Sequence, residues 1–261
     1  MTNTIKYGVI GTGVMGQEHI QNINIIENAE VVAICDTNEN SRNQTKSLVK
    51  DSTKFYNDLN ELISKNIADA YIIATPNFTH INILEHILKT NKHLLIEKPL
   101  CTTTEDCKKF EILSKNYSKI IWTGMEYRYM PPVKQLINEV HNNVIGKIKM
   151  LSIREHRFPF LHKVDDWNRF AINTGGTLVE KCCHFFDLMR LVIQSEPIKV
   201  YASGHQDVNH LSETYDGKTP DIIDNAFVIV DFENGVRGLL DLCMFAENSE
   251  YQEEIVAVGD I

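Results

Sequence analysis

The chain has 261 residues, enough for one large domain or two of ordinary size. Apolar residues make up 43% of it and charged residues 23%, and no apolar run approaches the ~20 residues that a bilayer-spanning helix needs, so a membrane protein is excluded. With 35 acidic against 26 basic side chains, the net charge is −9. This charge disfavours a nucleic-acid partner, because such partners are bound by neutralising their phosphates.

Residues 1–4 lead straight into an apolar segment, without the basic flank, apolar stretch and cleavage site of a signal peptide. A cytoplasmic protein is therefore expected. The six cysteines form no CxxC pair, and thiols stay reduced inside cells, so we predict free and mostly buried cysteines.

The first half of the chain alternates short β-branched runs with longer segments of helical periodicity. This alternation is typical of βαβ units on a parallel sheet. Strands are predicted at residues 5–11, 30–36, 54–57, 69–76, 93–99 and 119–125. Residues 1–125 are accordingly expected to form an α/β domain with a doubly wound parallel sheet.

Long extended runs dominate the second half, after a helix that is predicted over 133–144. Further strands are predicted at 148–158, 199–206, 222–232, 236–245 and 252–258, with one strong helix at 178–193. The turn Glu233-Asn234-Gly235 between two of these runs favours a hairpin. We therefore expect an α+β domain over 126–261, with an open sheet that is mixed or antiparallel.

A GxGxxG motif directly follows the first predicted strand and precedes a helical segment. Its residues are Gly11, Thr12, Gly13, Val14, Met15 and Gly16. The glycines permit a tight turn and close approach of a pyrophosphate to a helix N-terminus. Asp36 ends the next strand, 20 residues after Gly16, where a carboxylate can bind both ribose hydroxyls of an adenosine. This spacing favours a dinucleotide site over a structural turn with an unrelated surface aspartate.

Asp36 also bears on the choice of cofactor. Its charge would repel a 2′-phosphate, and no Arg or Lys lies between Thr37 and Ser41 to neutralise one. Arg42, the nearest cation, could fold back toward it. The sequence therefore favours NAD over NADP.

Two polar clusters follow the strands predicted at 69–76 and 93–99. The first contains Ala74, Thr75, Pro76 and Asn77 with His80, and the second contains Glu97 and Lys98. Ligands of open α/β sheets bind at the carboxyl ends of the strands, so we predict that both clusters contact the cofactor. Lys98 lies between an apolar strand and a proline, which favours a functional amine over a surface ion pair.

The segment 174–187 carries a candidate proton acceptor. In a helix that begins near Thr177, Glu180, His184 and Asp187 would share one face. A histidine beside carboxylates suits proton transfer near neutral pH. The spacing also fits metal ligands, but a convincing third ligand is missing, so we predict no metal. The helix alone would equally fit a half-buried core histidine.

Five motifs in order resemble those of the Gfo/Idh/MocA family of dinucleotide-dependent dehydrogenases, which includes glucose-fructose oxidoreductase and inositol dehydrogenase. They are GTGVMG, ATPNFTH, EKP, EYRYMPP and GGTLVEKCCHFFDL, and they span nearly the whole chain. The resemblance implies an N-terminal Rossmann domain and a C-terminal α/β domain whose open sheet often forms the oligomer interface. Family members continue several tens of residues beyond the strand at 251–258, so it also implies an incomplete C-terminal domain.

The same resemblance implies roles for single residues. Lys98 of the EKP motif would bind the cofactor and the substrate hydroxyl, and His184 would exchange the substrate proton. Glu180 stands where the family has aspartate, one methylene longer, and would orient His184. Arg128, Trp167 and Arg169 resemble residues that line the substrate pocket in family members.

The expected function is an NAD-dependent oxidoreductase that transfers a hydride between the cofactor and a secondary hydroxyl of a sugar, cyclitol or sugar derivative. The alternative is a dinucleotide-binding regulatory or interaction protein that has lost turnover. A C-terminal sheet that ends at an apolar strand exposes an edge or face, which predicts a homo-oligomer joined through this sheet.

Overall fold

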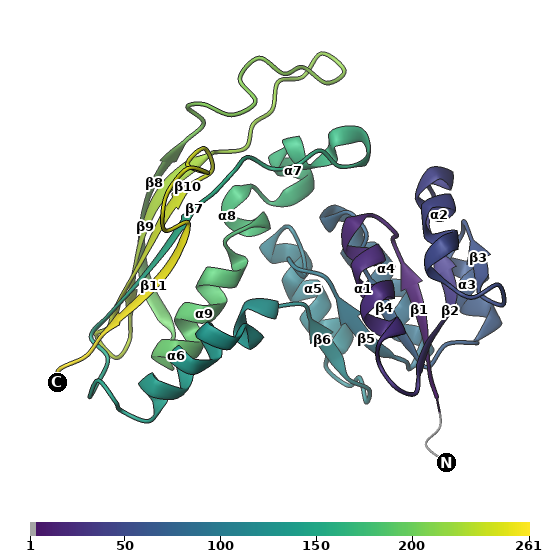
Figure 1. Cartoon of the computed structure of the whole chain (residues 1–261), viewed down its shortest axis with the longest axis horizontal. Helices are drawn as coiled ribbons and strands as arrows, with labels where there is room; N and C mark the ends of the chain where they lie inside the picture. The colour runs from purple at the N-terminus through teal and green to yellow at the C-terminus, as the bar shows by residue number, and fades with distance from the viewer. Residues whose placement is uncertain (1–3) are drawn as a thin grey trace. The chain divides into compact units, whose positions relative to one another are not determined.

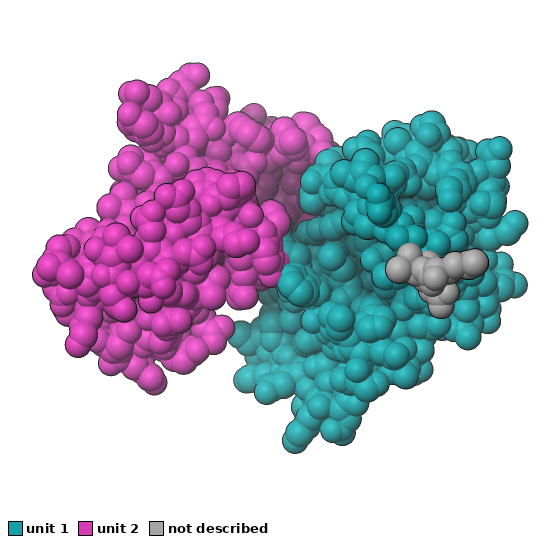
Figure 2. Space-filling view, turned by 60° about the horizontal axis from the view of Figure 1, so that its bottom comes forward, with its two compact units in different colours: residues 1–124, 173–175 teal, residues 125–172, 176–261 magenta. Residues whose placement is uncertain are grey.

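The computed structural model describes residues 4–261, which form two compact units (Figure 2). Unit 1 extends to Gly124 and includes Asn173–Gly175, and unit 2 comprises Met125–Ile172 and Gly176–Ile261. No helix in the described part of the chain has the length and apolarity needed to cross a membrane.

Unit 1 contains a six-stranded sheet in the order β3-β2-β1-β4-β5-β6, in which all neighbouring strands are parallel (Figure 1). The strands are β1 (Ile5–Ile10), β2 (Ala29–Cys35), β3 (Lys54–Tyr56), β4 (Ala70–Ile73), β5 (His93–Ile96) and β6 (Ile121–Thr123). The helices are α1 (Val14–Asn24), α2 (Glu39–Thr45), α3 (Leu59–Lys65), α4 (His80–Ile87) and α5 (Thr104–Ser114). This topology confirms the predicted doubly wound sheet. Its order reverses between β1 and β4, the point at which such sheets bind ligands.

Two apolar cores cover the two faces of this sheet, because successive strand residues point to opposite sides. Val9 of β1 packs in one core with Ile20 and Ile23 of α1. Its neighbour Ile10 packs in the other core with Leu84 of α4. The buried central strands therefore read as continuous apolar runs, as expected for a parallel sheet between helices.

Unit 2 contains a five-stranded sheet in the order β11-β7-β10-β9-β8. The strands are β7 (Met150–His156), β8 (Pro197–His205), β9 (Asn225–Phe232), β10 (Arg237–Cys243) and β11 (Glu253–Val258). The helices are α6 (Pro131–His141), α7 (Ala171–Thr174, which extends into unit 1), α8 (Thr177–Glu180) and α9 (Cys183–Ile193). Only β7 and β10 pair in parallel, so the sheet is mixed. The predicted hairpin is confirmed at β9–β10, where Gly235 adopts a φ of +84°.

The helix expected over 178–193 is wrong in one respect, because it is two helices. The two helices are separated by Lys181 and Cys182, whose backbones stay in the right-handed helical region. The Nζ of Lys181 lies 2.9 Å from the buried carboxylate of Glu155. Glu180 and His184 therefore lie in different helices.

One face of the unit 2 sheet is covered by α6 and α9, and the other face is open (Figure 1). On the covered face, Leu151 of β7 and Val228 of β9 are buried against Phe185 of α9. On the open face, apolar side chains are exposed, with Phe227 at 61% and Ile229 at 43%.

The segment between β8 and β9 is held by one buried carboxylate, Asp224. Its oxygens accept hydrogen bonds from the backbone amides of Asp207 at 3.0 Å, Val208 at 2.8 Å and Asn209 at 2.7 Å. Burial raises the pKa of Asp224, but these hydrogen bonds outweigh burial and hold it below its ordinary value. The ionised form is therefore the one that orders this segment.

We expect Asp224→Asn to lower the free energy of unfolding by about 2 kcal/mol, since hydrogen bonds to a charged group contribute about 1.5–3 kcal/mol. Because the folded-state pKa of Asp224 is depressed, its contribution is present above the unfolded pKa of about 3.9 and is lost as the pH falls through the folded value. Urea unfolding of both proteins should show a large difference at neutral pH that shrinks under acid. Asp216→Asn, at an exposed position of the same segment, is the control.

Candidate active site

The three glycines of the GxGxxG loop differ in the space around the position that a Cβ would occupy. Gly11 has a φ of +86°, and a Cβ there would lie 2.6 Å from the backbone of Ala74. A Cβ at Gly16 would lie 2.0 Å from the carbonyl oxygen of Gly11. Nothing lies within 4 Å of the corresponding point at Gly13. Gly11 and Gly16 thus pack the loop against the sheet, while Gly13 leaves open space at the start of α1.

This open space lies at a helix N-terminus with free donors. The first helical hydrogen bond of α1 runs from the Gln17 amide to the Gly13 carbonyl at 3.0 Å. The amides of Val14, Met15 and Gly16 precede it and so have no helical acceptor. Together with the positive end of the helix dipole they suit an anion, and these residues fit the pyrophosphate of a dinucleotide.

Asp36 lies beside this loop, just beyond the end of β2. Its Oδ2 accepts hydrogen bonds from the amide and hydroxyl of Thr12 at 2.7 and 3.0 Å, and its Oδ1 accepts one from the Asn38 amide at 2.8 Å. A carboxylate has about four acceptor positions, so Asp36 retains capacity for a ribose hydroxyl. Arg42 does fold back, as the sequence allowed, and donates to the main-chain carbonyl of Asp36 at 2.5 Å.

His80, which the sequence predicts to contact the cofactor, is held by the two loops on either side of it. It is fully buried, and its two ring nitrogens lie 3.0 Å from the carbonyl oxygens of Pro99 and Thr75. Burial lowers its pKa, against the hydrogen bonds. A neutral imidazole has one N–H, so His80 donates to one of these carbonyls and packs against the other. In this way it links the loop after β4 to the loop after β5.

Glu97 is likewise a supporting residue. Its buried carboxylate has Oε1 2.6 Å from His19 Nε2 in α1, and its Oε2 accepts the Lys98 amide at 3.2 Å. These contacts anchor the end of β5, and the predicted contact of Glu97 with the cofactor stays a prediction. Lys98 follows it, half-buried, before a cis peptide to Pro99. Its backbone is fixed, as the sequence predicted.

The remaining residues of the first strand-end cluster shape the loop after β4. The backbone of Ala74 meets Gly11, and the Thr75 hydroxyl accepts a hydrogen bond from the Thr79 hydroxyl at 2.7 Å. Pro76 caps a short 3₁₀ turn that begins at Asn77, which is buried. These contacts place the cluster beside the glycine loop, at the topological switch point.

His184 lies in the first turn of α9 and is 2% exposed. Its Nε2 lies 3.3 Å from Oε1 of Glu126, and its ring is stacked on that of Tyr127 with centroids 4.4 Å apart and planes 9° from parallel. Neither Glu126 nor Tyr127 was expected from the sequence to be a site residue. The only available signal was their place in the EYRYMPP motif, directly after a strand.

The two carboxylates expected beside His184 are both paired with cations. Glu180 is buried, with Oε1 3.7 Å from Lys163 Nζ, and Asp187 forms a two-point pair with Arg128 in which the Nε to Oδ2 distance is 2.5 Å. Asp187 therefore fixes α9 to the segment before α6. Within residues 4–261, no group of three metal-binding side chains is assembled.

Arg128 and Arg169, for which the resemblance implies a place in the substrate pocket, are both paired with carboxylates. Arg169 is 1% exposed, and its Nε donates to Glu213 at 3.1 Å. Burial raises the pKa of Glu213, but hydrogen bonds from His210, Tyr215 and Arg169 lower it to about 2. Trp167, the third such residue, is half-buried under the Lys163 ammonium, which lies 4.9 Å from its ring centroid.

Both halves of the sequence match one protein family. Residues 5–125 match its "Oxidoreductase family, NAD-binding Rossmann fold" domain, and residues 137–257 match its "C-terminal alpha/beta domain". Myo-inositol 2-dehydrogenase of Thermotoga maritima is 30% identical over 237 residues, which cover 91% of this chain and 68% of that protein. Rhizopine catabolism protein MocA of Rhizobium meliloti is 25% identical, over 91% of this chain and 70% of its own length.

Solved structures agree with this assignment. A probable dehydrogenase from Thermotoga maritima superposes with a TM-score of 0.80 at 29% identity, covering 98% of this chain and 73% of that one. The WlbA dehydrogenase of Bordetella pertussis, solved with NADH and UDP-GlcNAcA, has a TM-score of 0.84 at 20% identity, covering 99% and 78%, and shares the fold. The glycine loop and Asp36 fit the NAD that this family binds. The chain belongs to the Gfo/Idh/MocA family of NAD-dependent oxidoreductases.

Proposed function

We propose that this protein interconverts a secondary alcohol and a ketone on a cyclitol, a sugar or a sugar derivative. The observation that carries the proposal is the open helix N-terminus at Gly13 beside the Asp36 carboxylate, which suits a dinucleotide. Relatives named for inositol and for glucose 6-phosphate support a polyol substrate. The family's chemistry supports turnover over a purely regulatory role.

In this proposal His184 is the proton acceptor for the substrate hydroxyl. The Glu126 carboxylate, 3.3 Å from Nε2, favours the imidazolium that forms when His184 takes the proton. Lys98 binds the cofactor and the substrate hydroxyl, as the EKP motif implies. The nicotinamide, when bound, supplies the hydride acceptor, and the protein supplies orientation and proton transfer.

The test is a substrate panel monitored by the absorbance of reduced nicotinamide. It should include inositol isomers, other cyclitols, aldoses, sugar phosphates and sugar acids, each with NAD, and the matching ketones with NADH. Turnover with at least one cyclitol or sugar supports the proposal. Tight NAD binding without turnover across the panel would instead establish the regulatory alternative.

Cofactor preference should depend on Asp36. We expect Asp36→Ser combined with Thr37→Arg to shift the ratio of NADP to NAD affinity by about tenfold or more, because repulsion is removed and a phosphate partner is added. Calorimetric titration of both cofactors measures this ratio. Thr37→Arg alone is the control for the added cation, and tighter binding of NADP by the unaltered protein would contradict the assignment.

We further propose that the open face of the unit 2 sheet joins two or more copies of the chain. Its exposed apolar residues include Tyr201 of β8, Phe227 and Ile229 of β9 and Leu239 of β10. Such a contiguous apolar face is typical of an interface.

Light scattering should give an oligomer for the unaltered chain and a monomer for Phe227→Asp with Ile229→Asp. NAD binding should survive this change, because unit 1 is not altered. Ile112→Asp, at an exposed apolar residue of α5 in unit 1, should leave the oligomer intact. A monomeric unaltered chain at low micromolar concentration would sink the idea.

A further inference from the structure

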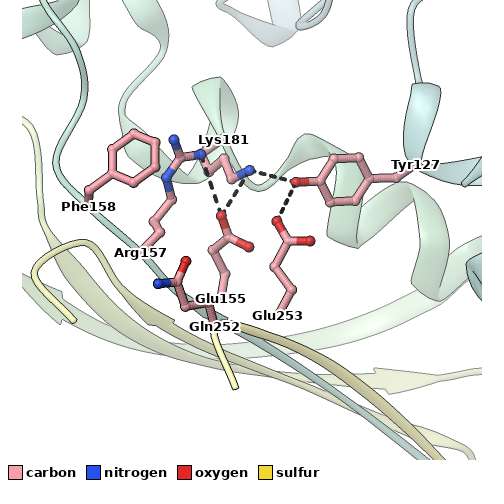
Figure 3. Close-up of a pocket in the computed structure, with 7 residues that line it drawn as sticks. All are labelled: Tyr127, Glu155, Arg157, Phe158, Lys181, Gln252 and Glu253. Atoms are coloured by element: carbon pink, nitrogen blue, oxygen red, sulfur yellow. Dashed lines mark hydrogen bonds and ion pairs between the residues drawn. The ribbon is translucent and has the colours of Figure 1, made fainter. Parts of the chain in front are cut away.

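A polar network in unit 2 ends on the ring that stacks against His184. Lys181 Nζ lies 2.9 Å from Glu155 Oε1 and donates to the Tyr127 hydroxyl at 2.8 Å. The Tyr127 hydroxyl in turn donates to Glu253 Oε1 at 2.9 Å. Figure 3 shows these groups around a pocket of about 410 Å³, with Lys181 between Glu155 and Tyr127. We call Lys181, Glu155, Glu253 and Tyr127 the tyrosine anchor.

Two members of the tyrosine anchor are buried, while Glu253 is exposed. Glu155 is 1% exposed and Lys181 is also buried. Burial raises the pKa of Glu155, and Lys181 opposes this. A buried ion pair is a poor source of stability, because desolvation can exceed the attraction, but it can fix one arrangement against alternatives. What this pair fixes is the phenol of Tyr127.

The Tyr127 ring is held along its edge and face as well as at its hydroxyl. Phe185 meets it edge-on with centroids 5.6 Å apart, and Lys181 Nζ lies 5.0 Å from its centroid. The ring stacks on the imidazole of His184 with planes 9° from parallel. A ring fixed in this way sets the plane of the imidazole, while Glu126 is near its Nε2.

The chain brings the tyrosine anchor together from distant segments. Glu155 comes from β7, Glu253 from β11, Lys181 from the break between α8 and α9, and Tyr127 from the segment before α6. Lys181 lies at the interruption between α8 and α9, and α9 begins one residue before His184.

We propose that Tyr127 is a positioning residue for His184, with Lys181 and Glu253 fixing its hydroxyl. This inference rests on the proposed role of His184 as proton acceptor. General base catalysis requires the base within hydrogen-bond reach of the proton, and a displacement of about 1 Å can cost about 100-fold in rate. Tyr127 contributes by limiting the tilt of the imidazole and takes no part in the proton transfer.

The kinetic test separates the ring of Tyr127 from its hydroxyl. With the best substrate of the panel, we expect Tyr127→Leu to lower kcat about 10- to 100-fold with KM and NAD affinity within about twofold, because the base is misplaced while binding is kept. Tyr127→Phe keeps the stacked ring but loses the contacts of its hydroxyl with Lys181 and Glu253. It should therefore lower kcat much less than Tyr127→Leu does, by about two- to fivefold, and Glu253→Ala should have an effect of the same size or smaller. Tyr251→Leu, at an exposed tyrosine, is the control and should behave as the unaltered protein.

A spectroscopic test reads the stack without turnover. In histidine-labelled protein, the ring protons of His184 should resonate upfield because they lie over the Tyr127 ring, and His184→Ala identifies the signals by their loss. The upfield shift should persist in Tyr127→Phe and disappear in Tyr127→Leu. If no substrate of the panel is turned over, the proposed function fails, while this experiment still decides whether the stack exists.

Two results would overturn the inference. One is a Tyr127→Leu protein that keeps the kcat of the unaltered protein or keeps the upfield shift of the His184 signals. The other is a parallel loss of kcat, NAD affinity and melting temperature in both Tyr127 variants, which would indicate a merely structural residue. If Tyr127→Leu does not fold, Glu253→Ala loosens the phenol at an exposed carboxylate, and displaced His184 signals with lower kcat are then expected. Unchanged signals and kcat in that variant would count against Tyr127 as well.

Discussion

Replacing His184 by Ala or Lys98 by Met is expected to lower kcat for the best polyol substrate about 100-fold or more, since a positioned acid–base group contributes a factor of that size. His184 is buried, and its Nε2 lies beside the Glu126 carboxylate. A buried histidine with a charged partner is a candidate for acid–base catalysis. NAD affinity should change little in His184→Ala. We expect it to weaken in Lys98→Met, because the family motif implies that this amine contacts the cofactor.

Steady-state kinetics at saturating NAD measure the first effect, and a binding titration measures the second. The chain offers matched controls in His86→Ala and Lys89→Met, which remove the same groups from exposed positions in and just after α4. Both controls should keep full activity. Near-normal turnover in both His184→Ala and Lys98→Met would remove these residues from the mechanism.

The parts of the site that the sequence predicted well are local in the chain. Gly11, Gly13 and Gly16 lie in one turn between a strand and a helix, and Asp36 ends the next strand, so their placement follows from βαβ geometry alone. The same geometry placed Lys98 at the end of β5. Such residues can be located because the secondary structure that holds them is adjacent in sequence.

The parts that the sequence could not predict depend on contacts between distant segments. Tyr127 meets His184 across the unit 2 fold, and no periodicity links them. The interruption between α8 and α9 was equally hidden, because the apolar pattern continues through it. A sequence also cannot distinguish a polar side chain that faces a pocket from one that is paired with another residue. Arg169, for which the resemblance implied a place in the pocket, is buried and donates a hydrogen bond to Glu213.

Substitutions at Gly13 and Gly16 of the glycine loop should have opposite effects, one on NAD binding and the other on stability. Gly16→Ala would place its Cβ 2.0 Å from the backbone oxygen of Gly11, which cannot move aside cheaply. We expect unit 1 to be destabilised by about 1–3 kcal/mol, the range for overpacking. Thermal or urea unfolding measures this loss, and reduced NAD binding would follow from it indirectly.

Gly13→Asp should leave folding intact and abolish binding. Gly13 is the N-cap of α1, with φ −65° and ψ −164°, a backbone that any residue adopts, and open space surrounds it. Aspartate is a favoured N-cap whose carboxylate accepts the first helical amides, so stability should be equal or slightly higher. The same carboxylate occupies the anion position and repels a pyrophosphate, which should raise the Kd for NAD about 100-fold or more, since opposed like charges cost several kcal/mol. Gly13→Ser, a neutral N-cap of similar size, separates charge from bulk by losing less affinity. Tight NAD binding by a well-folded Gly13→Asp protein would show that the helix N-terminus does not hold the cofactor phosphates.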